Sequence, residues 1–136
     1  MKKKILLSIL LLIFQACGES QCIDFHKLVL KQHCNLIVER NYNTEERSFS
    51  LSTLKLEGLN IETKKSEIFH PETRGWRLYA KHIAIGDTVV KKQGEAIMRI
   101  YKKDSIITIS YEDFCDKTKF NQDNVLKIIV RDSIGK

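Results

Sequence analysis

Two runs rich in β-branched and aromatic residues lie close together in the second half of the chain, at residues 96–101 and 105–111. Only the tripeptide Lys102-Lys103-Asp104 separates them. Such residues favour strands, and so short a connection joins antiparallel neighbours, because a parallel crossover needs a dozen residues or more. The segment therefore predicts a β-hairpin, and the fold has to accommodate an antiparallel sheet.

The remainder of the chain predicts more short strands and one helix. Residues 23–33 place apolar side chains at helical spacing, whereas residues 35–42 alternate with a period of two. A strand through residues 49–56 has to change phase near Thr53, as a β-bulge would allow. Further strands are predicted at residues 59–63, 76–85 and 88–90, and a long loop at residues 62–73.

The final predicted strand, residues 125–131, is apolar on both faces, at Leu126, Ile128, Ile129 and Val130. This pattern indicates a central position in the sheet, because an exposed face would be polar. Seven or eight short strands and no alternating β–α units predict a mainly β protein. We expect a single antiparallel β-sandwich or open barrel with one short N-terminal helix.

The first sixteen residues have the pattern of a bacterial signal peptide. Three lysines precede the mainly apolar run 5–14, which ends at Gln15-Ala16-Cys17. A spanning helix needs about 20 apolar residues, so this run is too short to serve as a membrane anchor. We therefore expect export of the chain.

The tetrapeptide Phe14-Gln15-Ala16-Cys17 resembles the lipobox of bacterial lipoproteins. The resemblance implies a diacylglycerol thioether on Cys17 and attachment of the protein to a membrane of the cell envelope, facing the periplasm or the cell surface. The expected organisation is then a signal peptide at residues 1–16, a lipidated tether at 17–21 and one β-rich domain at 22–136. The alternative is that Cys17 is an ordinary cysteine of a secreted or periplasmic protein.

Half of the formal charge of +6 belongs to Lys2, Lys3 and Lys4, so a chain that begins at Cys17 carries +3. The remaining lysine pairs are scattered among acidic residues and form no basic block. A nucleic-acid partner is therefore not expected.

The four cysteines stand at positions 17, 22, 34 and 115, and export permits disulfides. Lipidation of Cys17 leaves three thiols, hence one bridge and one free cysteine. A helix over residues 23–33 holds Cys22 and Cys34 roughly 18 Å apart, too far for a bridge. Each of the two residues, Cys22 and Cys34, therefore either pairs with Cys115 or stays free. We favour Cys34–Cys115, because both residues lie at ends of predicted strands.

Candidate chemistry is sparse. Cys22, His26 and His33 fall on one side of the predicted helix, and Cys34, His70 and His82 could add ligands from elsewhere. This set lacks the paired spacings of zinc motifs, and no cysteine lies in a nucleophile motif. We assign no catalytic, cofactor-binding or metal-binding residue.

The segment Gly86-Asp87-Thr88-Val89-Val90-Lys91 is similar to a turn of biotinyl and lipoyl carrier domains. Met98-Arg99-Ile100 resembles their modified hairpin, but Arg99 stands where the acylated lysine would be. Arginine cannot form that amide, so we interpret the segment only as a β-turn.

These observations favour a non-enzymatic module that binds a protein, peptide or glycan. Trp76, Tyr79 and Tyr101 are its candidate contacts, because aromatic residues dominate binding hot spots. A core position is the alternative for Trp76. Two other classes stay open: an inhibitor or immunity-type lipoprotein, and a small metal-dependent or cysteine hydrolase in which histidines converge with a thiol or carboxylate.

Overall fold

The computed structural model describes residues 21–45 and 51–130. The predicted signal peptide, the lipobox with Cys17 and residues 18–20 of the tether lie outside these ranges. Within them, no helix is long and apolar enough to cross a bilayer.

Seven antiparallel strands form one sheet in the order β3-β2-β1-β4-β5-β6-β7. The strands are β1 (Cys34–Asn41), β2 (Leu56–Asn60), β3 (Ser66–Phe69), β4 (Thr88–Lys91), β5 (Ile97–Tyr101), β6 (Ser105–Ser110) and β7 (Leu126–Val130). A helix over residues 21–31 precedes β1. The connections among the described residues include the 3-10 segments η1 (Tyr42–Thr44), η3 (Gly75–His82) and η4 (Gln122–Asn124).

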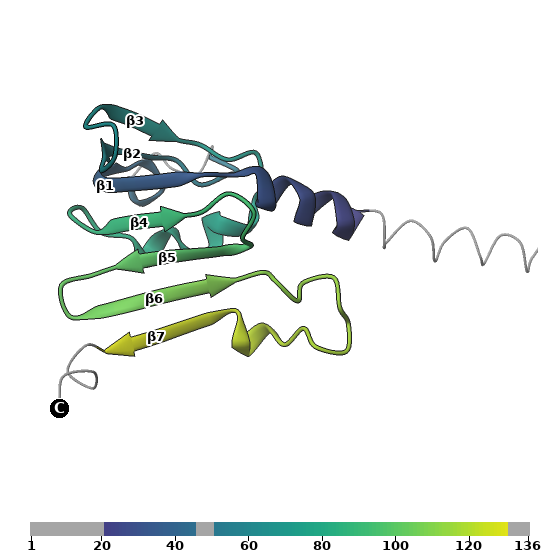
Figure 1. Cartoon of the computed structure of the whole chain (residues 1–136). Coiled ribbons are helices and arrows are strands. Elements are labelled where there is room, and N and C mark those ends of the chain that lie inside the picture. Colours follow the sequence, from purple (N-terminus) through teal and green to yellow (C-terminus); the bar gives the residue numbers. More distant parts are fainter. Residues whose placement is uncertain (1–20, 46–50, 131–136) are drawn as a thin grey trace, which may run out of the picture.

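The structure confirms a mainly β, antiparallel fold with one N-terminal helix. The predicted hairpin is formed by β5 and β6, whose five paired positions run from Ile97↔Ser110 to Tyr101↔Ile106. The strands lie in a single open sheet, with neither a second packed sheet nor closure into a barrel within the described residues (Figure 1). In the described part of the chain, β3 and β7 are therefore the two edge strands of the sheet.

One face of the sheet, which we call the inner face, carries the hydrophobic core. The side chains of Leu36, Val89 and Ile100 stand side by side on neighbouring strands and are almost completely buried. The N-terminal helix contributes Val29 to this core, and η3 contributes Trp76. Burial of such side chains is worth about 1.5–3 kcal/mol each, which explains why the helical segments pack on this face.

A β-bulge lies where β1 pairs with β2, between Val38 and Arg40. Gly58 of β2 stands opposite Val38, and a Cβ atom at Gly58 would lie 2.1 Å from the carbonyl oxygen of Ile37. Only glycine permits this approach of the two strands. The predicted bulge near Thr53 is wrong, because Thr53 lies in a bend before β2 begins at Leu56 and not in a strand.

The structure differs from the sequence prediction in two segments. Residues 76–85, predicted as a strand, begin with the 3-10 segment η3. Trp76 and Ala80, four residues apart, are buried, whereas Leu78 is 68% exposed. A strand would have placed Trp76 and Leu78 on the same face. The predicted loop at residues 62–73 contains β3, a polar edge strand with little apolar alternation.

The prediction of a central position for the last strand is wrong. β7 pairs only with β6 and is the edge strand of the sheet. Ile128, Ile129 and Val130 are 55, 45 and 49% exposed. Apolar residues on both faces of this strand therefore do not indicate that it is buried.

Candidate functional site

Cys22, in the first described turn of the N-terminal helix, forms a disulfide with Cys115 in the segment that follows β6, with a Cα–Cα distance of 5.6 Å. The predicted Cys34–Cys115 pairing is therefore wrong. Cys115 lies beside Cys22, whereas Cys34 follows the other end of the same helix, twelve residues further along the chain. At 1.5 Å per helical residue this is roughly 18 Å, beyond the reach of a bridge.

Cys34 is the free cysteine of the described residues, and it is buried. Its Sγ donates a weak hydrogen bond to the carbonyl oxygen of Val89, 3.7 Å away. Burial raises the pKa of this thiol to about 12, so it is not ionised at neutral pH. Cys34 is therefore a core residue without nucleophilic character.

An open groove of about 650 Å³ lies beside the disulfide. Its lining combines apolar side chains with charges of both signs, from Cys22, Ile23, Glu112, Phe114, Cys115, Asp116 and Lys117. The described residues that line the groove include no histidine and no free thiol.

The histidines do not converge on one site. His70 hydrogen-bonds through Nε2 to the Thr53 hydroxyl at 2.8 Å, and His82 lies in η3, where burial first and then Lys81 and Lys102 lower its pKa. Across residues 21–45 and 51–130, no group of three histidine, cysteine or acidic side chains could hold a metal ion. His26 and His33 consequently have no third ligand within that part of the chain.

The predicted aromatic contacts occupy different environments. Trp76 is completely buried, and its Nε1 donates a hydrogen bond to Oε1 of Gln32 at 2.6 Å. It belongs to the core and cannot contact a partner. Tyr79 is half-buried against Tyr111, with ring centroids 6.4 Å apart. Of the three residues, only Tyr101 lies on the exposed face of the sheet.

The Gly86-Asp87 segment forms a turn, as predicted. Gly86 has a φ of +90°, a conformation that side-chain-bearing residues rarely adopt. The Asp87 carboxylate accepts a hydrogen bond from the main-chain N–H of Ala84 and forms an ion pair with Lys102. Arg99 pairs with Glu95 at 3.0 Å. These contacts show that Gly86 and Asp87 serve to form the turn.

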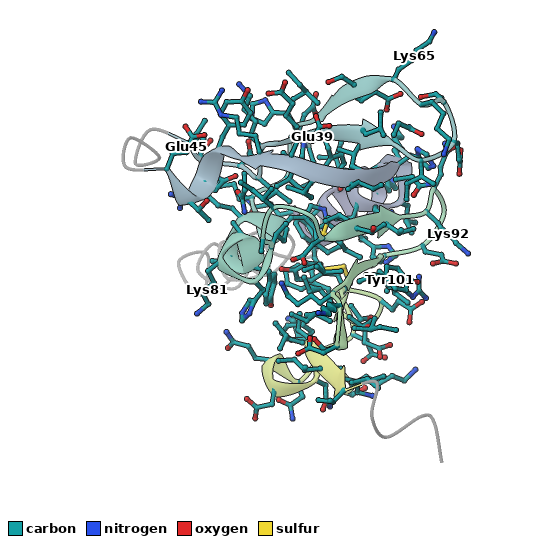
Figure 2. All side chains as sticks on the ribbon, turned by 90° about the vertical axis from the view of Figure 1, so that its left-hand side faces the viewer. Glu39, Glu45, Lys65, Lys81, Lys92 and Tyr101 are labelled. Carbon is teal, nitrogen blue, oxygen red and sulfur yellow. A yellow bond between two sulfur atoms is a disulfide. The ribbon has the colours of Figure 1, made fainter. Side chains whose placement is uncertain are left out.

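The face opposite the core, which we call the outer face, carries a row of side chains that crosses six strands. Each member stands directly opposite the next in the strand register: Leu59, Ile37, Thr88, Tyr101, Ile106 and Ile129. We call this set the outer row. Ile37 is 38% exposed and Ile129 is 45% exposed. Tyr101 lies on the side of the sheet away from Lys81 of η3 (Figure 2).

Mainly polar side chains flank the outer row on both sides. The next positions along the strands form a parallel row of Asn35, Val90, Arg99, Thr108 and Lys127, of which only Val90 is apolar. Beyond the other side, Arg40 forms an ion pair with Glu45, and its guanidinium lies 4.2 Å from the ring centroid of Tyr42. An apolar strip bordered by charges and hydrogen-bonding groups is the usual anatomy of a protein-binding surface.

The sequence indicated alternation in these strands, but it did not indicate which strands are neighbours. The outer row exists only because β1, from the first third of the chain, pairs with β4. Its signal in the sequence is an apolar residue at outward-facing positions, such as Ile37 and Ile106, where polar residues are expected.

In comparisons with known proteins, no family model, no curated protein and no solved structure matches this chain.

Proposed function

We propose that this chain is an exported bacterial lipoprotein whose folded domain is a non-enzymatic module that binds a protein partner through the outer row. The observation that carries the proposal is the outer row, which crosses six strands on the face of the sheet away from the core and has one polar member, Thr88. Its side chains are half-buried or exposed, and accessible, mainly apolar surface of this kind marks interaction sites.

A protein partner fits this surface better than a glycan or a small ligand. The outer row lies on a sheet face and includes one aromatic ring, Tyr101. Small ligands are usually held in concave pockets, and sugars commonly stack on several aromatic rings. Charged groups such as Arg99 and Arg40 border the row, where they would set orientation and partner choice. An inhibitor or immunity-type lipoprotein is a special case of this proposal, in which the partner is an enzyme or toxin.

Photocrosslinking in intact cells tests the interaction. A photoreactive phenylalanine analogue replaces Tyr101, and a matched control carries it at Ile85, which is 74% exposed in the segment before β4. We expect a crosslinked protein from position 101, and its loss when Ile37→Glu is added. Equal crosslinking from both positions, or crosslinking that Ile37→Glu leaves unchanged, contradicts binding through the outer row.

Lipidation is tested separately. We expect radiolabelled palmitate to enter the wild-type protein, and Cys17→Ala to abolish both labelling and membrane attachment. A wild-type protein without label, or an alanine variant that stays membrane-bound, contradicts the lipoprotein assignment. Neither result bears on the outer row.

A further inference from the structure

β7 combines two properties that rarely occur together. It is an edge strand of the sheet (Figure 1), and four of its five side chains are apolar, with Lys127 the only charge. Edge strands usually carry charges or prolines that prevent pairing with another chain. The opposite edge follows this rule, because β3 begins with Ser66 and Glu67 and comes directly after Lys64 and Lys65.

The hydrogen bonds to β6 determine which groups of β7 face the free edge. The main-chain N–H of Ser110 donates to the carbonyl oxygen of Val125 at 2.8 Å. In an antiparallel ladder, hydrogen-bonded positions recur at every second residue, so Lys127 and Ile129 also direct their main-chain groups toward β6. The N–H and C=O groups of Leu126, Ile128 and Val130 therefore point away from the sheet.

We propose that β7 pairs with β7 of a second copy of this chain. The strands run antiparallel about a two-fold axis at Ile128, and the two sheets join into one. Ile128 then faces Ile128 of the second copy, and Leu126 faces Val130 of the second copy. The main-chain N–H and C=O groups of these residues point away from their own sheet. Each pair therefore makes two main-chain hydrogen bonds between the two copies.

Charge selects this register among those that the backbone allows. Shifting one strand so that the axis passes through Lys127 places the two Lys127 ammonium groups directly opposite each other, which is unfavourable. Shifting the axis to Ile129 reduces the overlap of the two β7 strands from five residues to three. With the axis at Ile128, Lys127 stands opposite Ile129 of the second copy, and all five residues are paired.

The same geometry covers the exposed apolar groups. A two-fold axis perpendicular to the sheet keeps both inner faces on the same side. Ile128 then meets Ile128 of the second copy, Val130 meets Leu126 of the second copy, and the two cores extend toward each other. Because the interface uses β7 on both copies, it is closed and cannot propagate. The expected assembly is a dimer and not a fibre.

Disulfide crosslinking of the full chain in its native membranes tests the pairing. Ile128→Cys places the two thiols at the axis, where opposed Cα atoms lie about 5.5 Å apart, within the range of a disulfide. Ile68→Cys on the other edge strand is the matched control, because Ile68 is 58% exposed. We expect a dimer on a non-reducing gel for Ile128→Cys and none for Ile68→Cys. Equal yields overturn the proposal.

A charge introduced at Ile129 tests the register. In the proposed dimer, Ile129→Glu faces Lys127 of the second copy twice per interface, so we expect the dissociation constant of the detergent-extracted full chain to fall by about twofold or more. Ile128→Lys, which opposes itself at the axis, is expected to raise it about tenfold. Circular dichroism confirms that both variants are folded. Weaker dimerisation of folded Ile129→Glu overturns this register, whereas partner crosslinking at Tyr101 is a separate outcome that tests the outer row.

Discussion

The amino group of Lys91 donates a hydrogen bond to the main-chain carbonyl oxygen of Gln32, 3.1 Å away. The Lys91 side chain is completely buried, and it also donates to the carbonyl oxygen of Lys92 at 2.7 Å. Within the described residues, no carboxylate forms an ion pair with it. Gln32 follows the N-terminal helix, so the ammonium group lies at the helix end that favours a positive charge.

We predict that Lys91→Met lowers the free energy of unfolding by about 1–3 kcal/mol, because two carbonyl oxygens lose their donor while the buried volume is preserved. Urea denaturation at neutral pH measures the change. Lys92→Met is the matched control, since Lys92 is exposed, and we expect an effect within about 0.5 kcal/mol. Equal stabilities of the two variants contradict a structural role for Lys91.

The same variant has a predicted pH dependence. Burial lowers the pKa of Lys91 below its ordinary value of 10.5. The folded protein therefore releases this proton at a lower pH than the unfolded chain does. The contribution of Lys91 to stability rises with pH between these two values and is constant above the unfolded value. Relative to Lys91→Met, the wild-type protein should gain stability from neutral pH to about pH 10.5; a constant difference would refute this.

Tyr111 is predicted to give the opposite pH dependence. Its hydroxyl donates to the carbonyl oxygen of Gly75 at 2.9 Å, and burial first, then Tyr79, raises its pKa above the ordinary value of 10.0. Tyr111→Phe should cost about 1 kcal/mol below that pH, because it removes one hydrogen bond and keeps the ring. Above about pH 10 the unfolded wild-type chain loses the proton first, so the wild-type advantage should shrink.

Denaturation curves of wild-type protein and Tyr111→Phe at pH 7 and at pH 11 make the comparison. Tyr101→Phe is the control on the outer face. The difference in the free energy of unfolding between wild-type protein and Tyr111→Phe should be smaller at pH 11. An unchanged difference would show that the Tyr111 phenol does not keep its proton in the folded state.

The Cys22–Cys115 disulfide spans 93 residues of the chain. The double variant Cys22→Ser, Cys115→Ser should lose about 2–5 kcal/mol of stability, because the unfolded chain regains the freedom that the bridge removes. Guanidinium unfolding measures this loss, and Cys34→Ala is the control that leaves the bridge intact.

Peptide mapping under non-reducing conditions checks the pairing itself. We expect the peptide with Cys22 to be joined to the peptide with Cys115. We also expect alkylation of Cys34 only after unfolding, because the thiol is buried and its pKa is raised to about 12. A peptide that joins Cys34 to Cys115 would contradict the fold around the N-terminal helix.

Local patterns in the sequence predicted the elements that depend on short-range order. The β5–β6 hairpin follows from two strand-forming runs and a three-residue connection, and the N-terminal helix follows from apolar spacing after Cys22. Residues 76–85 show the limit of such patterns. Their apolar positions suit a strand as well as a helical segment, and packing of Trp76 and Ala80 against the sheet selects the helical segment.

The sequence by itself determined that this chain is mainly β, that its strands are short and antiparallel, and that a helix keeps Cys22 from bridging to Cys34. The tertiary structure alone decided the order of the strands, and with it the Cys22–Cys115 bridge, the outer row and the edge position of β7. The physical reason is that periodicity reports which side of a strand is apolar, whereas strand order depends on pairing between residues far apart in the chain. β1 and β4, for example, join Leu36 to Val89 across more than fifty residues.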